Sequence, residues 1–153
     1  MGWLSSCLTV LKSLLLKELA SSLRVNYPVR FVCLQYHATP EDAQVFEEYS
    51  GQPLYFPKAL DTFNDLDGLA AAISACDYVV TSSNITAHLV GGLGKAGSVL
   101  LPRGNGLIWY WGVKDEQTPW YPSLKLIRQT QRGDWHGALA ILHEQISSAS
   151  LVK

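Results

Sequence analysis

The sequence has few charged residues, and neither sign of charge is in excess. Charged residues make up 16% of the 153 residues and the formal net charge is −1, whereas soluble domains usually contain about 25% charged residues. Binding to nucleic acid through general attraction needs a basic surface, so we expect no nucleic-acid partner. Hydrophobic residues make up 48% of the chain, which excludes a mainly disordered protein. We therefore expect one folded domain with extensive burial or an interface.

Cysteine is also scarce, and the usual metal-binding patterns are missing. Cys7, Cys33 and Cys76 lie far apart, their number is odd, and no CxxC pair is present. Neither a disulfide framework nor a zinc site is indicated. His143-Glu144 lacks the second histidine of an HExxH motif. We expect reduced thiols, a cytoplasmic location and no metal or other cofactor.

Long hydrophobic runs are absent too. Residues 8–16 form the most apolar stretch near the start, and Thr9, Lys12 and Ser13 interrupt it. It is far shorter than the ~20 apolar residues that span a bilayer, and it lacks the charge pattern and cleavage site of a signal peptide. Leucines at helical spacing predict an amphipathic helix of about 20 residues over 4–23. We assign residues 1–25 to this helix, whose apolar stripe packs on this domain, a missing domain or a partner.

Residues 26–150 have the pattern of an α/β domain. Thr39, Asp65 and Asp134 are helix-start signals, and Gly51 and Gly94 are stop signals. Short apolar segments alternate with these helices, which is typical of a parallel sheet covered on both faces. The sequence therefore predicts a Rossmann-like, three-layer α/β/α fold with a mostly parallel sheet of about five strands. The predicted strands are 29–35, 54–56, 77–82, 98–101 and 124–128, and the predicted helices after the first are 40–50, 66–76, 84–93 and 134–148.

The most informative loop joins the third predicted strand to the helix that follows it. Either Ser83 or Asn84 can cap this helix, leaving backbone N–H groups and the positive end of the helix dipole for an anion such as phosphate. His88 lies one turn further on the same face. It either donates to a diphosphate or packs against the next loop. The alternative interpretation of the whole segment is that it is simply a well-capped helix. The candidate anion-binding residues are Ser82, Ser83, Asn84, Ile85, Thr86 and His88.

Other candidate residues follow the ends of the first two predicted strands. In open α/β sheets, ligands bind at the carboxyl ends of the strands. Gln35 can bond a nucleobase or a sugar there, or lie in a solvated loop. After the second strand, Asp61, Asp65 and Asp67 can hold ribose hydroxyls, or Asp65 or Asp67 can cap the next helix.

Four of the five tryptophans lie in the last third of the chain: Trp109, Trp111, Trp120 and Trp135. Aromatic faces stack on bases or sugars. The same side chains can instead fix a long irregular loop to the body of the domain. The sequence leaves both interpretations open.

Several short motifs occur together in a characteristic order. They are DLDGLAA (65–71), SNITAHL (83–89), GGLG (91–94), WYPS (120–123), RQ (128–129) and GDW (133–135). Together they resemble the C-terminal half of bacterial family 9-type glycosyltransferases, which are related to heptosyltransferases. The version at the end of tetratricopeptide-repeat proteins is the most similar. The resemblance covers about residues 29–146.

The resemblance implies a GT-B architecture, in which two Rossmann-like domains enclose the active site. The C-terminal domain of such enzymes binds the nucleotide-diphosphate sugar without a metal. The matching family positions are Asn84 and His88 at the diphosphate and Gln35 at a strand end. Ser83 departs from the family, which usually has Asp there. The implied reaction is transfer of a hexosyl or heptosyl group to an acceptor hydroxyl.

The N-terminal acceptor domain of this architecture is missing from these 153 residues. We therefore assign no catalytic residue, and expect activity only when a partner chain or domain completes the enzyme. The alternative is a non-catalytic interaction module that docks a partner through its N-terminal helix. A homodimer formed through that helix suits either hypothesis.

Overall fold

The computed structural model describes residues 14–104, 108–113 and 116–148. Its helices are α2 (Leu16–Ser22), α3 (Pro40–Ser50), α4 (Leu66–Ala75), α5 (Ile85–Gly92) and α6 (His136–Ser148), with a short 3-10 helix, η1 (Trp109–Trp111). Its strands are β1 (Phe31–Val32), β2 (Leu54–Tyr55), β3 (Val79–Ser82), β4 (Gly97–Leu101) and β5 (Leu124–Arg128). The predicted α/β class and the alternation of strands and helices are confirmed.

The strands pair in parallel, as predicted, but they form two sheets instead of one. β1 pairs with β2, and β3–β4–β5 form the other sheet. A cleft lined by residues of both β1 and β3 separates the two sheets. β1 is also shorter than the predicted strand at 29–35, because its partner β2 supplies only two paired residues.

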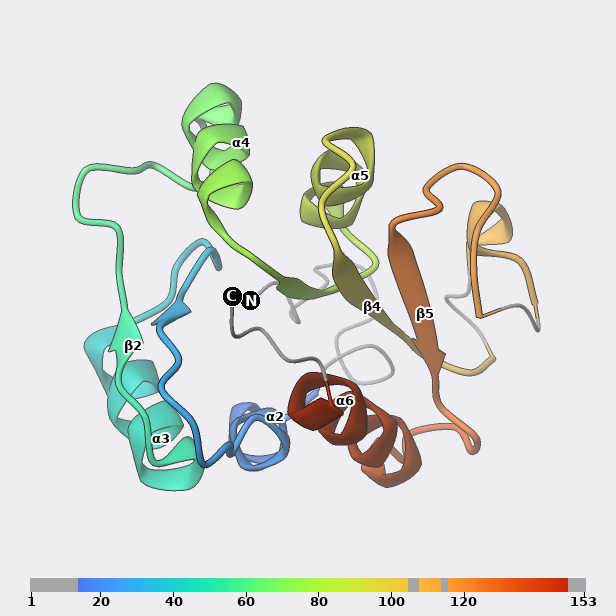
Figure 1. The fold of residues 1–153 in the computed structure, drawn as a ribbon, viewed down its shortest axis with the longest axis horizontal. Helices are drawn as coiled ribbons and strands as arrows, with labels where there is room; N and C mark the ends of the chain where they lie inside the picture. Colours follow the sequence, from blue (N-terminus) through green and yellow to red (C-terminus); the bar gives the residue numbers. More distant parts are fainter. Residues whose placement is uncertain (1–13, 105–107, 114–115, 149–153) are drawn as a thin grey trace.

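Two hydrophobic clusters place both sheets in one layer. On β4, Leu100 belongs to the first cluster, whereas Val99 and Leu101 belong to the second. On the β1 side, Cys33 and Leu34 divide between the clusters in the same way. This alternation is what a strand covered on both faces requires. Figure 1 shows α4 and α5 on one face and α2, α3 and α6 on the other, so the three-layer α/β/α arrangement is confirmed.

Helices α3 and α4 begin where the capping signals predict, whereas α6 begins at His136, two residues after the predicted start at Asp134. Thr39 and Asp42 form a reciprocal capping box at the start of α3, and Gly51 ends that helix in the left-handed conformation. Asp65 caps α4 by accepting from the backbone N–H of Gly68. Each cap satisfies N–H groups that the first helical turn leaves without partners.

The first helix begins later than predicted. Leu15 has an extended backbone, so α2 starts at Leu16 and covers only the end of the predicted segment. Residues 4–13 lie outside the described residues. Leu19, Ala20 and Leu23 are buried in the first cluster, so α2 packs within the same core as the rest of the domain. None of the described helices is long and apolar enough to cross a membrane.

Candidate functional site at the carboxyl ends of the strands

Asn84 forms the link between β3 and α5. Its backbone is extended, and its side-chain Oδ1 accepts from the N–H of Ala87 at 3.3 Å. The hydroxyl of Thr81 donates to the same oxygen at 3.1 Å. Of the two residues predicted as possible caps, Asn84 therefore caps α5. Ser82 is the last residue of β3 and leads into this turn.

Ser83 instead holds the loop that contains η1. The indole Nε1 of Trp111 donates to the Ser83 hydroxyl at 2.9 Å. Trp111 is only 1% exposed, so the bond lies beside a buried ring. This contact fixes residues 108–113 against the start of α5.

His88 sits between two tyrosines. Its Nδ1 lies 3.0 Å from the Tyr121 hydroxyl, and its Nε2 lies 3.2 Å from the Tyr110 hydroxyl. The ring also stacks on Trp111, with centroids 5.4 Å apart and an interplanar angle of 23°. Both ring nitrogens are therefore engaged by the loops. Of the two interpretations of His88, packing against the next loop describes the structure.

Tyr110 and Tyr121 were not identified as site residues by sequence reasoning. Tyr121 is 33 positions from His88 along the chain, and both tyrosines lie in segments without helical or strand periodicity. The density of aromatic residues in this part of the sequence is the signal from which the two tyrosines could have been identified. We call the group of side chains that these contacts join the aromatic lock; its members are Ser83, His88, Tyr110, Trp111 and Tyr121.

The first turn of α5 presents two different surfaces. Ile85 is 55% exposed, whereas Thr86 is buried. Thr86 lines the cleft between β1 and β3, as does Leu34, which lies two residues after the end of β1. The N-terminus of α5 thus faces the carboxyl edge of the sheet, where the helix dipole favours an anion.

Gln35 is buried and lies in the segment that follows β1, next to Leu34. It is 8% exposed, and among the described residues no hydrogen-bond partner reaches its Oε1 atom. Native proteins rarely leave a buried amide oxygen without a partner, because the desolvation cost is then not offset. Gln35 makes no described contact with the aromatic lock. Its neighbour Leu34 shares the cleft with Thr86.

The loops after β1 and β2 meet through aromatic rings. His37 has a positive φ of 57°, a left-handed conformation that is uncommon for a residue other than glycine. Its ring lies 6.0 Å from the ring of Phe63, and the ring of Tyr36 lies 5.4 Å from Phe63. Phe63 is 61% exposed. These rings form an accessible apolar surface near Gln35.

The aspartates after β2 support local structure. Asp61 accepts from the backbone N–H groups of Phe63 and Asn64, and from the Asn64 side chain at 2.8 Å. The hydrogen bonds with Asn64 are the main cause that lowers the pKa of Asp61. Asp65 is the cap of α4, so the capping interpretation describes it. Asp67 is exposed in the first turn of the same helix.

The four tryptophans divide into two pairs. Trp111 and Trp135 are buried, at 1% and 5% exposed, and hold loops against the core. Trp109 and Trp120 are 78% and 61% exposed. The fixing role therefore describes Trp111 and Trp135, while the other pair presents its faces outward.

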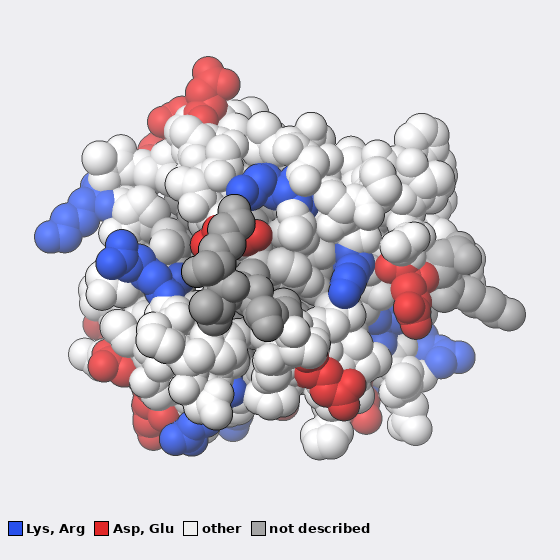
Figure 2. All heavy atoms as spheres, in the orientation of Figure 1, with Lys and Arg blue, Asp and Glu red and all other residues white. Residues whose placement is uncertain are grey.

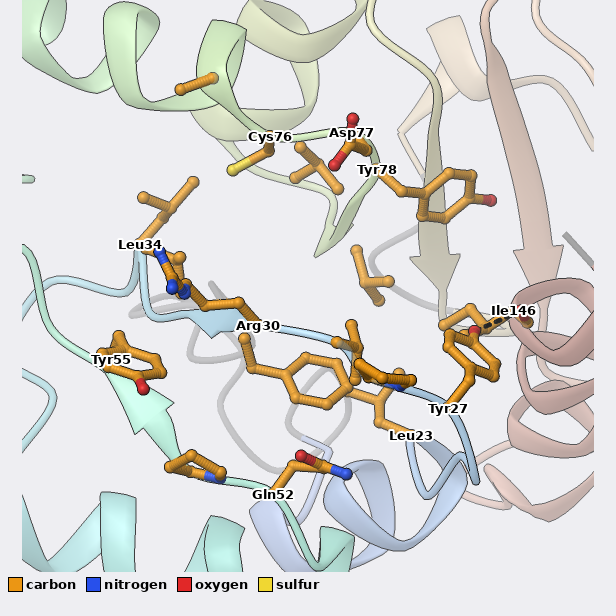
Figure 3. A pocket seen from close by; sticks show the side chains of 18 of the residues that line it. Leu23, Tyr27, Arg30, Leu34, Gln52, Tyr55, Cys76, Asp77, Tyr78 and Ile146 are labelled. Carbon is orange, nitrogen blue, oxygen red and sulfur yellow. Dashed lines mark hydrogen bonds between the residues drawn. The ribbon is translucent and has the colours of Figure 1, made fainter. Parts of the chain in front are cut away.

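The cleft between β1 and β3 has a volume of about 800 Å³ (Figure 3). Tyr78 lines the cleft, but its ring extends over β4, where its hydroxyl bonds the Ser98 hydroxyl at 2.7 Å, and burial raises the pKa of Tyr78. Burial likewise raises the pKa of the Cys76 thiol on the same side. On the other side lie Arg30 and Tyr55, whose cation and ring are 5.4 Å apart.

The charge on the surface is low and mixed. Figure 2 shows basic and acidic side chains interspersed on the displayed face, with wide uncharged areas between them. Among the residues that the structure describes, no group of three or more histidine, cysteine, aspartate or glutamate side chains is placed to hold a metal ion.

Comparison with known proteins gives one relative of partial length. Over 107 residues, which are 70% of the chain, the sequence is 34% identical to Protein FlbA of Caulobacter vibrioides. The chain spans only 17% of the length of that protein. No family model matches the chain. No solved structure matches it either.

Proposed function

We propose that this domain is the donor-binding half of a GT-B glycosyltransferase and that its ligand is a nucleotide-diphosphate sugar. The observation that supports this most is the position of α5, which begins directly after β3 at the carboxyl edge of a parallel sheet. Open α/β sheets bind their ligands at this edge. The motif resemblance implies a diphosphate contact at the same residues, which supports the proposal.

The start of α5 is suited to the diphosphate. The helix has eight residues and is capped by Asn84, so its dipole is fixed in direction. The amides of Ile85 and Thr86, together with the hydroxyls of Ser82 and Ser83, supply hydrogen-bond donors for phosphate oxygens. The same groups stabilise the diphosphate as it leaves the sugar, which is where negative charge develops in this reaction.

Gln35 provides a second contact for the nucleotide. Its buried Oε1 accepts a hydrogen bond from a base or a ribose hydroxyl, which would satisfy the atom that has no partner among the described residues. We assign His88 to a positioning role, because its two ring nitrogens already contact Tyr110 and Tyr121. In this proposal, His88 holds the aromatic lock over α5 and does not touch the diphosphate.

The transfer step requires an acceptor domain beside this one. The family supplies the acceptor contacts and the catalytic base from its N-terminal domain, so this domain alone binds the donor without turnover. We place the activity in the cytoplasm, since Cys33 and Cys76 are free thiols and free thiols persist in reducing compartments.

Calorimetry with nucleoside diphosphates and their sugars tests the proposal. We expect at least one nucleotide to bind, and Asn84→Ala to weaken that binding by about 1–3 kcal/mol, the cost of losing a hydrogen bond near a charged group. Asp65→Ala is the matched control, because it removes an equivalent cap from α4 and leaves the cap of α5 in place. Both variants lose about 1 kcal/mol of stability with the cap.

Two results would contradict the proposal. One is the absence of binding by every nucleotide, even at millimolar concentration. The other is equal weakening of binding in both variants, which would show that the effect of Asn84→Ala comes from stability and not from a ligand contact.

A further inference from the structure

Two exposed tryptophans lie in the segments that carry the tyrosines of the aromatic lock. Trp109 is 78% exposed and Trp120 is 61% exposed. Each is the chain neighbour of a tyrosine that contacts His88, namely Tyr110 and Tyr121. Tryptophan is highly buried on average in folded proteins. Two exposed indoles on contacting segments therefore mark a candidate binding surface, and we call them the tryptophan pair.

The buried Thr118 joins the two segments that carry the pair. Its hydroxyl donates to the Tyr110 carbonyl at 3.4 Å and accepts from the backbone N–H of Trp120 at 3.3 Å. Thr118 is only 2% exposed, so the bridge is protected from water. Figure 1 shows both segments beside β5, at the outer end of the β3–β4–β5 sheet. The two tryptophans therefore belong to one surface.

The aromatic lock fixes the backbone beneath this surface. Trp111, two residues after Trp109, is 1% exposed, and its indole N–H donates to the Ser83 hydroxyl. The Tyr121 N–H donates to the Thr118 carbonyl at 3.3 Å. Because these loops are held in place before a ligand arrives, binding has a smaller cost in conformational entropy.

The charge near the pair does not favour a ligand that contains phosphate. The only charged residues of the sequence from 108 to 123 are Lys114, Asp115 and Glu116, which give a net charge of −1. Arg128 adds one positive charge from β5, and its guanidinium donates to the Trp111 carbonyl. No excess of positive charge is present to hold phosphate groups. Aromatic faces stack on bases and on sugars, and of these a neutral sugar fits the charge.

The area of the pair suits a small ligand better than a protein. A large aromatic side chain presents up to about 250 Å², so at these exposed fractions the two rings present about 350 Å² together. Exposed apolar patches of about 300–600 Å² on a monomer are often functional. Each side of a stable protein interface covers about 800 Å², more than twice the area of the pair.

We propose that the tryptophan pair binds an uncharged oligosaccharide, with the apolar C–H faces of its sugar rings stacked on the two indoles. Gln117, three residues before Trp120, is exposed, and its amide supplies both donors and an acceptor for sugar hydroxyls. The pair shares no residue with the proposed diphosphate contacts at α5. The proposal therefore does not depend on nucleotide binding.

NMR titration of the full chain with maltohexaose, cellohexaose and chitohexaose tests this proposal. All three probes are uncharged hexasaccharides. We expect at least one of them to bind and to shift the indole N–H signals of Trp109 and Trp120. Trp111 and Trp135, which are 1% and 5% exposed, are internal controls whose indole signals should stay in place.

Substitution of the exposed rings measures their contribution. Trp109→Ala and Trp120→Ala should each weaken saccharide binding by about 10- to 30-fold, as expected for a tryptophan at the centre of a binding surface. Trp120→Phe should recover part of the loss, because it keeps a smaller aromatic face. Phe63→Ala is the matched control: Phe63 is also 61% exposed but lies in the loop after β2, so its loss should leave the affinity unchanged.

Nucleoside diphosphate binding by the same variants reports separately on the proposed function, and Trp109→Ala and Trp120→Ala should leave it unchanged. Three outcomes would overturn the saccharide proposal. The first is no binding by any of the three probes at millimolar concentration. The second is equal weakening by Phe63→Ala. The third is self-association that Trp109→Ala or Trp120→Ala abolishes while no saccharide binds, which would assign the pair to a protein interface.

Discussion

Trp111 connects two parts of the candidate site at the scale of a single residue. Its indole N–H reaches Ser83 at the start of α5, and its ring stacks on His88 one turn later. A buried ring that also donates a hydrogen bond fixes both position and orientation. The loop of residues 108–113 and the start of α5 should therefore be stabilised as one unit.

Trp111→Phe tests this connection. Phenylalanine keeps an aromatic ring but leaves the Ser83 hydroxyl without its donor, so we expect the free energy of unfolding to fall by about 1–3 kcal/mol. Trp109→Phe is the control, because Trp109 is 78% exposed and surface changes usually stay within about 0.5 kcal/mol. Urea denaturation measures both variants. Equal stability of the two would contradict the role assigned to Trp111.

Individual site residues were predictable where the signal is local. Asn84 and Asp65 cap the helices that follow them, because an Asx cap depends on a few neighbouring residues. The partners of His88 were not predictable, since they come from segments 22 and 33 residues away. The unpartnered oxygen of Gln35 likewise depends on tertiary burial.

At the scale of elements, α5 shows how closely a helix and a loop can approach. Gly91 lies against Tyr121, so that a Cβ at this position would fall 2.7 Å from the Tyr121 Cβ and closer still to its ring. Gly92, the next residue, has nothing within 4 Å of the corresponding position. Of these two glycines, only Gly91 therefore permits the close contact between α5 and the loop that carries Tyr121.

The two adjacent glycines form a matched pair of variants. Gly91→Ala should lower the free energy of unfolding by about 1–3 kcal/mol, because the added methyl group overpacks against Tyr121. Gly92→Ala should be neutral or stabilising by up to about 1 kcal/mol, since alanine favours helix and space is available. Thermal or urea denaturation compares the two. A larger loss from Gly92→Ala would contradict the described packing.

Helix bounds were predicted more closely than strand lengths. The helix at 66–76 ends one residue earlier than predicted, and the helix at 40–50 has the predicted bounds. Helix limits follow from capping residues nearby in the sequence. The length of β1 depends on its neighbours, and here only β2 pairs with it among the described residues. The start of α2 at Leu16 similarly departs from the leucine periodicity, because Leu15 has an extended backbone.

At the scale of the whole molecule, the alternating apolar strands were sufficient to predict the class and the layers. Both faces of the sheet layer are covered by helices, as the two hydrophobic clusters show. The division into two sheets was not predictable, because the sequences of the strands do not specify which edges meet. That gap lies beside the capped start of α5, where doubly wound sheets bind their ligands.

The central claim is that the carboxyl edge around α5 holds a nucleoside diphosphate. Mapping backbone amide shifts by NMR during a titration with the nucleoside diphosphate that binds in calorimetry tests this claim most directly. The account predicts the largest shifts at Ile85, Thr86 and Ala87, with a smaller change at Gln35. Shifts confined to other surfaces, such as the exposed face of α6 (His136–Ser148), would contradict it.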